Sequence, residues 1–289
     1  MPRSLNKTLI YVALIVWTIV ALFPIFWTFS TTFKVAKDVQ LGNIIPWVQY
    51  KPGWLGLRAI GLSPDTIFNP STPREEFLKR FWNSIQASAG GAGLALIIGS
   101  MAAYGLSRFQ YRWKIWKNRD ISFFFLSQLI LPPVVLAMPF LVLYKELALL
   151  DSMIGLILIY ALSVLPIVIW IMKDQFDSIP LELEQAALVD GCSSWGAFLR
   201  IILPIALPGM VAAFILSVIL CWNEYFFAAL LTSTNAKTLP VMVASQTGSQ
   251  GISWWSMAAL ASAAILPLII IGIALERYIV KGLTAGSGK

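Results

Sequence analysis

Six apolar runs constrain this chain, because each is long enough to cross the hydrocarbon core of a bilayer. In chain order they are Leu9–Phe29, Ile85–Leu106, Ile121–Tyr144, Ile154–Met172, Ile205–Leu231 and Trp255–Val280. Backbone polar groups in hydrocarbon must bond within their own segment, so each run is predicted to be a helix. Of the 289 residues, 58% are hydrophobic and 12% are charged, which is too few charges for a water-soluble domain. The sequence therefore predicts an all-α, polytopic membrane protein with six transmembrane helices.

Two features of the runs refine this prediction. The first run is too long for a signal peptide, and no small-residue cleavage site follows Phe29, so we expect a retained span. Proline removes a backbone hydrogen bond and bends a helix. We therefore expect kinks at the prolines inside the runs, which are Pro24, Pro132, Pro133, Pro139, Pro166, Pro208 and Pro267.

Basic residues concentrate in the short flanks on one side of the predicted spans. On that side lie Arg3, Lys7, Arg108, Arg112, Lys114, Lys117, Arg119, Lys173, Arg200, Arg277, Lys281 and Lys289. The opposite short loops carry only Lys145 and Lys237. Lysine and arginine favour the cytoplasmic side, whereas long loops translocate largely regardless of charge. Both termini are therefore predicted to face the cytoplasm.

The composition argues against several functions. The formal net charge of +7 comes from residues beside the apolar runs, so no nucleic-acid partner is predicted. The chain has no histidine, and Cys192 and Cys221 are isolated, so we predict neither a metal site nor a disulfide framework. It also lacks a Gly-rich phosphate-binding loop that ends in Lys-Ser or Lys-Thr. We predict that this chain is not an enzyme and binds no cofactor of its own.

A polar segment between the fourth and fifth runs carries the signals of two short helices. Pro180 suits the first turn of a helix, and Gly191 ends that helix because glycine readily adopts the left-handed conformation. Ser193 or Ser194 is suited to cap a second helix. The segment is therefore predicted to form a sharp helical elbow on the cytoplasmic side.

The partner of this elbow has two interpretations. A helix that rests on lipid headgroups would carry lysine and arginine on its polar face. Here the polar residues are mainly acidic, and Trp195 and Phe198 add aromatic rings. Either the elbow lies on lipid or it is held by another protein, and the composition favours a protein.

The elbow resembles the EAA loop of the inner-membrane permease subunits of binding-protein-dependent ABC importers. The family pattern is Glu-Ala-Ala, then Asp-Gly, then Ile-x-Leu-Pro, and it is matched by Ala186, Ala187, Asp190, Gly191, Ile201, Leu203 and Pro204. Gln185 occupies the place of the motif's glutamate, and Glu184 directly precedes it. Either Glu184 supplies the salt bridge expected from that glutamate, or a hydrogen bond from Gln185 replaces it.

Two further segments resemble the carbohydrate branch of this family. Trp222–Phe226 is similar to its Trp-Asn-Glu-Phe pattern, and Arg277–Thr284 is similar to the ending of its maltose-type second permease subunit. The resemblance covers about residue 83 to the end. It implies the type I permease fold in the bacterial inner membrane and an importer for a sugar, polyol or sugar glycoside. An ABC permease for an amino acid or peptide is the alternative, and a polytopic membrane enzyme is a weaker one.

The apolar runs, together with the resemblance from about residue 83 onward, predict four parts of the chain. Residues 1–31 form the cytoplasmic N-terminal end and the first transmembrane helix, and residues 32–83 form a periplasmic loop. Residues 84–281 form the permease core with five transmembrane helices and a coupling loop at about 173–204, and residues 282–289 form a cytoplasmic tail. The loop at 32–83 is expected to be either a partly helical cap at the membrane surface or disordered.

Partners and site residues follow from the same resemblance. In the family the EAA loop is a coupling helix that docks on an ATPase subunit, which implies coupling residues Glu184, Gln185, Ala186, Ala187, Asp190, Gly191, Ser193, Trp195 and Phe198. The implied partners are a related second permease in a heterodimer, two ABC ATPase subunits, a periplasmic substrate-binding protein and membrane lipid. ATP and Mg would be bound by the ATPase subunits.

Glu224 is an acidic residue deep in the fifth run, where an ionisable group is costly and usually faces protein or water. Two interpretations have equal weight. Glu224 either faces the substrate pathway or makes a structural hydrogen bond. Under the first interpretation the candidate pathway residues are Trp222, Asn223, Glu224 and Tyr225.

Overall fold

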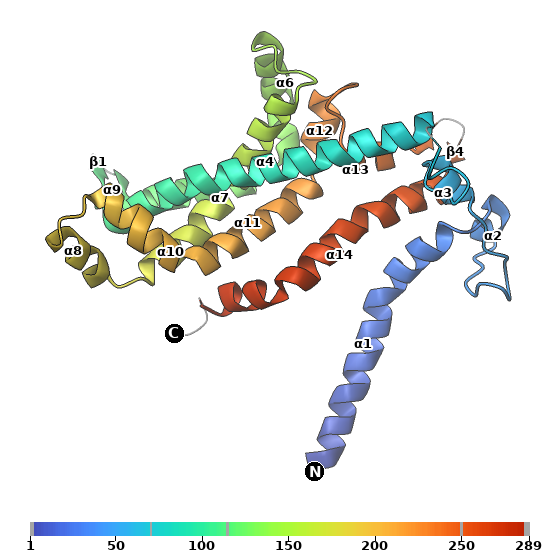
Figure 1. The fold of residues 1–289 in the computed structure, drawn as a ribbon, viewed down its shortest axis with the longest axis horizontal. Coiled ribbons are helices and arrows are strands. Elements are labelled where there is room, and N and C mark those ends of the chain that lie inside the picture. The colour runs from blue at the N-terminus through green and yellow to red at the C-terminus, as the bar shows by residue number, and fades with distance from the viewer. Residues whose placement is uncertain (1–2, 70, 114–115, 249–250, 286–289) are drawn as a thin grey trace. The chain divides into compact units, whose positions relative to one another are not determined.

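The computed structural model describes residues 3–69, 71–113, 116–248 and 251–285, and its secondary structure is mainly helical (Figure 1). The chain divides into two compact units. Unit 1 comprises Met1–Lys79 and Met242–Pro267, and unit 2 comprises Arg80–Val241 and Leu268–Lys289. Three of the described helices, α4 (Thr72–Arg108), α13 (Leu239–Ala244) and α14 (Trp254–Ala285), contribute to both units.

Four helices in the described part of the chain are long and apolar enough to cross a membrane. They are α1 (Arg3–Thr31), α4, α7 (Met153–Asp177) and α14. Two bent helix pairs bring the number of candidate spans to as many as six. The prediction of an all-α, polytopic protein is therefore confirmed, but not every run is one straight helix.

The third predicted span is broken in the middle. It consists of α5 (Asn118–Ser127), the 3-10 turns η1 (Gln128–Ile130) and η2 (Pro133–Leu136), and α6 (Ala137–Glu146). The two halves meet at an angle of 93°. Leu131 and Pro132 have extended backbones, because a residue that precedes proline is pushed out of the helical region. The expected bend at the proline pair is confirmed, whereas the expectation of one continuous helix was wrong.

The fifth predicted span is interrupted as well. Three residues, 223–225, separate helix α11 (Leu207–Trp222) from α12 (Phe226–Leu231). At the other end of α11, a bend of 74° separates this helix from Ser194–Ile205. Pro208 lies in the first turn of α11, where its missing N–H leaves no bond unmade, so it starts the helix instead of kinking its interior. The run therefore begins later and is less continuous than predicted.

Unit 2 is built on the packing of α7 against α11, which lie side by side (Figure 1). Helix α4 approaches α7 closely at Gly91, where a Cβ atom would lie only 2.6 Å from Cβ of Tyr160. Buried side chains from these helices, such as Ile159, Val168 and Met172, form the core. Within unit 2, the polar elbow lies at one end of this bundle and α12 lies toward the other end (Figure 1).

Short elements complete the described chain. The hairpins β1–β2 (Arg112–Trp113 with Trp116–Lys117) and β3–β4 (Thr247–Gly248 with Gly251–Ile252) have two residues in each strand and leave the all-α class unchanged. Helix α13 (Leu239–Ala244) follows α12.

The segment at 32–83 is partly helical, as one of the two interpretations expected. It contains α2 (Ala36–Gln40), α3 (Leu55–Ala59) and the first turns of α4. The predicted boundaries at 83/84 and 281/282 both fall inside helices, α4 and α14. Lys114 lies outside the described residues, and so do the last four residues of the predicted tail, which include Lys289.

A polar clamp fixes the loop that follows α12. The Asp151 carboxylate accepts hydrogen bonds from the four consecutive backbone N–H groups of residues 233–236, at 2.9 to 3.1 Å. The backbone carbonyl groups of the same loop are also bonded. The Arg80 guanidinium donates to the carbonyl oxygen of Thr234 at 2.5 Å, and the Asn83 side-chain amide donates to that of Asn235 at 2.7 Å. Burial opposes ionisation of Asp151, but the N–H groups of residues 233–236 hold its pKa well below the ordinary value of 3.8.

Replacing Asp151 by Asn should destabilise unit 2. Hydrogen bonds to a charged group contribute about 1.5–3 kcal/mol, and the amide of asparagine would face N–H donors. Because the folded pKa is depressed, the contribution is present above pH 3.8 and is lost as the pH falls through the folded pKa. The difference in melting temperature between wild type and Asp151→Asn should be constant near neutral pH and shrink in strong acid. The matched control is Asp174→Asn, at an exposed site; equal effects of the two substitutions would contradict the clamp.

Candidate coupling and pathway sites

The elbow forms as its sequence signals predict. Helix α8 (Leu181–Val189) starts directly after Pro180, and Gly191 follows its end with φ of +87°. Ser193 caps α9 (Ser194–Ala197) by accepting a hydrogen bond from the Gly196 N–H at 3.1 Å. The chain then continues through a π-helical turn, η3 (Phe198–Ile202), and α10 (Leu203–Ile205).

A buried ion pair joins the elbow to the end of α4. Nε of Arg108 donates to Glu184 Oε2 at 2.9 Å, and both side chains are more than nine-tenths buried. The Tyr104 hydroxyl donates to the other carboxylate oxygen, and a second Arg108 nitrogen donates to the carbonyl oxygen of Ile179 at 3.1 Å. A buried ion pair is stable only when further hydrogen bonds satisfy both groups, and this one meets that condition.

Aromatic rings pack around the same carboxylate. The rings of Tyr104 and Phe198 lie 4.4 Å apart between centroids, and Phe176 meets Tyr104 edge-on at 5.8 Å. Trp195 stacks on Phe198 at 5.3 Å. The ion pair and these rings attach α8 and α9 to α4 and α7.

The predicted coupling residues divide into two groups. Those that are buried face the rest of unit 2; they are Glu184, Ala187 and Phe198. Those that are exposed form its outer surface; they are Gln185, Ala186, Asp190, Gly191, Ser193 and Trp195. Val189 is 87% exposed and Trp195 is 54% exposed, although both are large and apolar. Exposed apolar patches rimmed by polar groups mark interaction sites.

The structure shows how Glu184 and Gln185 are placed at the position where the family motif has its glutamate. Both carboxylate oxygens of Glu184 are engaged inside the chain, by Tyr104 and Arg108. Gln185, the next residue, is exposed. The Glu184 carboxylate is therefore already paired within the chain, whereas the Gln185 amide lies on the outer surface; a contact of Gln185 with a partner stays a prediction.

The four candidate pathway residues surround the break between α11 and α12. Both carboxylate oxygens of Glu224 accept hydrogen bonds from backbone N–H groups of α12, from Phe227 at 2.9 Å and from Ala228 at 3.1 Å. The Tyr160 hydroxyl donates to the backbone oxygen of Glu224 at 3.2 Å. Glu224 therefore caps α12, which supports the structural interpretation of this residue.

The neighbours of Glu224 differ in exposure. Trp222 is 5% exposed, and its ring packs edge-on against Phe81 at 5.8 Å. Asn223 and Tyr225 are exposed. Asn223 and Tyr225 are thus the two most exposed of the four residues, Glu224 is partly buried, and their contact with substrate stays a prediction.

Comparison with known proteins identifies the family. Residues 95–285 match the family described as binding-protein-dependent transport system inner membrane component. A trehalose transport system permease protein of Mycobacterium tuberculosis is 33% identical over 93% of this chain and 93% of its own length. The chain belongs to this family. It is therefore a multi-pass transport component of the inner membrane.

Two more relatives extend the comparison of this transport component. A trehalose/maltose transport system permease protein of Thermococcus litoralis is 31% identical over 99% of this chain and 98% of its own length. A solved chain of a bacterial ABC transporter involved in the import of the acidic polysaccharide alginate is 22% identical. It superimposes with a TM-score of 0.72 and covers 96% of this chain and 98% of that chain. The predicted fold of an ABC importer permease is confirmed.

Sequence reasoning missed the residues that hold the elbow in this permease. Arg108 entered only as a charge that sets orientation, and Tyr104 was not singled out. Asp151, which holds the loop after α12, was not singled out either. Arg108 and Glu184 are 76 residues apart, so no local pattern connects them. The one available signal was the position of Arg108 directly after an apolar run that precedes a polar loop.

Replacing Glu184 by Ala should loosen the elbow, because it leaves the Arg108 guanidinium buried without its partner. Breaking a buried pair in this way costs roughly 3–5 kcal/mol. We expect a lower melting temperature and faster proteolysis within residues 178–204. The matched control, Glu182→Ala, removes an exposed carboxylate from the same helix and should change neither measurement. Equal sensitivity of the two variants would show that the pair does not hold the loop.

Replacing Glu224 by Ala should destabilise α12, because two backbone N–H groups lose their acceptor. Loss of a helix cap costs about 0.5–2 kcal/mol. Asn223→Ala should leave the melting temperature nearly unchanged, since the one hydrogen bond of its side chain within the described part of the chain goes to the carbonyl oxygen of Ile219, one turn earlier. If Asn223 contacts the solute, its variant should raise the KM of uptake. An unchanged KM would remove Asn223 from the pathway.

Proposed function

We propose that this chain is the transmembrane permease subunit of an ATP-driven importer for a sugar, polyol or sugar glycoside. It forms half of the translocation pathway and couples to an ATPase through its EAA-type loop. The observation that carries the substrate class is the identity with permeases named for trehalose and trehalose/maltose along nearly the whole chain. The exposed Asn223 and Tyr225 offer an amide and an aromatic face, which suit sugar hydroxyls and rings.

The proposed complex contains four kinds of partner. A related second permease completes the pathway as a heterodimer, two ABC ATPase subunits bind ATP and Mg, a periplasmic protein delivers substrate, and lipid surrounds the spans. A solved neighbour, the bacterial alginate ABC transporter in complex with an alginate pentasaccharide-bound periplasmic protein, supports this kind of assembly. Both termini and the elbow face the cytoplasm in this proposal, as the distribution of basic residues indicates.

The mechanism is a mechanical one. The outer surface of the elbow docks on an ATPase subunit, and closure of the two ATPase subunits displaces it. Because Glu184 and Phe198 are fixed to α4 and α7, the displacement is passed to the spans as a rigid-body movement. A ligand shifts such an equilibrium only by its differential affinity for the two states. The substrate-loaded binding protein biases one end and ATP biases the other.

The substrate class is tested on the reconstituted complex. Purified permeases and ATPases in proteoliposomes are mixed with the binding protein, and ATP hydrolysis is measured with sugars, polyols, amino acids and peptides in turn. A sugar or polyol should stimulate hydrolysis and be taken up. Stimulation by an amino acid or peptide alone would favour the alternative substrate class, and transport without any ATPase subunit would overturn the proposal.

Replacing Gly191 by Val should uncouple the importer. The φ of +87° at this turn is strained for a β-branched residue, so α9 would be redirected and the docking surface lost. Substrate-stimulated ATP hydrolysis and uptake should fall to background, while membrane insertion is retained. The matched control is Gly191→Asn, because asparagine tolerates the left-handed conformation. Normal uptake by the Val variant would contradict the role of this turn.

A further inference from the structure

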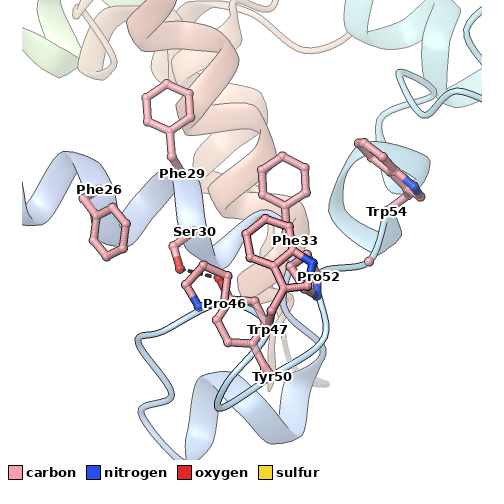
Figure 2. Close-up of a pocket in the computed structure, with 10 residues that line it drawn as sticks. Phe26, Phe29, Ser30, Phe33, Pro46, Trp47, Tyr50, Pro52 and Trp54 are labelled. Carbon is pink, nitrogen blue, oxygen red and sulfur yellow. Dashed lines mark hydrogen bonds between the residues drawn. The ribbon is translucent and has the colours of Figure 1, made fainter.

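Unit 1 contains a cavity of about 430 Å³ beside the end of α1. Helix α1 contributes Phe26 and Phe29, and the following segment contributes Phe33, Trp47, Tyr50 and Trp54 (Figure 2). A cavity of this size is large enough for a small ligand. It lies outside the elbow and outside the break between α11 and α12, so neither proposed site accounts for it.

The wall of this cavity is almost entirely apolar. Its two hydroxyls, those of Ser30 and Tyr50, bond to each other at 2.8 Å, as the dashed line in Figure 2 shows. A sugar in the cavity would leave most of its hydroxyls without partners, and each buried unpaired polar group is costly. Beside the wall, the buried ammonium of Lys34 lies over the Trp27 ring at 3.9 Å from its centroid and 5.2 Å from the centroid of the Tyr50 ring. The wall therefore selects hydrocarbon over a polar solute.

The loop at the mouth of the cavity presents apolar side chains to the outside. Its exposed large apolar residues are Ile44, Ile45, Trp47 and Val48, of which Trp47 and Val48 are 80% and 79% exposed. Trp47 has a positive φ of 61°, which is strained for a bulky residue. The backbone N–H of Trp47 donates to the backbone carbonyl oxygen of Tyr50 at 2.8 Å. The side-chain oxygen Oε1 of Gln49 accepts from the backbone N–H of Ile45 at 2.9 Å. The exposed apolar tip is thus held in a defined shape.

The cavity is continuous with the surface of α1. Large side chains of this helix are exposed around its whole circumference, among them Tyr11, Trp17 and Ile19. A helix that is apolar on all sides in a membrane protein faces hydrocarbon over part of its surface. Phe26 belongs both to this exposed surface and to the cavity wall. A lipid beside α1 therefore has direct access to the cavity.

We propose that this cavity seats one acyl chain of a membrane phospholipid. The loop tip Ile44–Val48 lies in the boundary layer of the bilayer, and the indole of Trp47 takes the headgroup position that tryptophan favours. In the proposed orientation the lipid belongs to the periplasmic leaflet. The seated chain attaches the segment after α1 to the bilayer, which offsets the strain at Trp47.

The first test counts retained phospholipids. Gly53 lines the cavity, and a Cβ atom there meets nothing within 4 Å, so the backbone has room for a side chain and Gly53→Leu should take up cavity space. Gly93→Leu is the matched control, because a Cβ atom at Gly93 on α4 also meets nothing within 4 Å. The complete transporter is exchanged into detergent and examined by native mass spectrometry. For each copy of this chain in the complex, we expect the Gly53→Leu variant to retain one phospholipid fewer than the wild type and the Gly93→Leu variant.

The second test identifies the occupant directly. A benzophenone amino acid replaces Trp54, which lines the cavity, or Phe68, which is 87% exposed in the same unit and does not line it. Irradiation in native membranes should add the mass of a phospholipid at position 54 and much less at position 68. A protein adduct at position 54 would overturn the proposal in favour of a subunit contact. Equal lipid counts in all three proteins, with no lipid adduct at position 54, would overturn it as well.

Discussion

The buried ion pair between Arg108 and Glu184 is the interaction on which the account of coupling depends. It joins the end of α4 to the first helix of the elbow, and both groups are satisfied by further hydrogen bonds from Tyr104 and to Ile179. Without this attachment, the apolar outer surface around Val189 and Trp195 would still bind a partner. Only the aromatic packing of Phe198 on Tyr104 and Phe176 would then hold the elbow to α4 and α7, so binding and movement would be less tightly linked.

The other end of unit 2 is fixed in a comparable way. Asp151 holds the N–H groups of the loop after α12, Arg80 and Asn83 hold its carbonyl groups, and Glu224 caps α12 itself. The fifth run is interrupted at two places, before α11 and between α11 and α12, and these places have different surroundings. One bend lies next to the elbow, and the other is enclosed by hydrogen bonds. A bundle fixed at both ends is suited to move as a body.

Local signals in the sequence predicted most of the fold and the shape of the elbow. The six apolar runs, the stop at Gly191 and the cap at Ser193 each depend on neighbours within a few residues. Partners that are distant in sequence could not be predicted. The inward direction of Glu184 depends on Arg108, and the shape of the loop after α12 depends on Asp151, which precedes that loop by more than 80 residues. The apolar wall of the cavity likewise depends on Tyr50 meeting Ser30 across the chain.

The most direct test of the central claim is a distance measurement across the ion pair during turnover. In a Cys192→Ser background, spin labels are placed at the exposed positions Glu182 on α8 of the elbow and Gln110 just after α4. Pulsed electron paramagnetic resonance then measures their separation in the complete transporter, with and without ATP. The account predicts the same distance distribution in both states, because the elbow and α4 move together. A clear shift in the distance on addition of ATP would show that the elbow moves independently and would contradict the account.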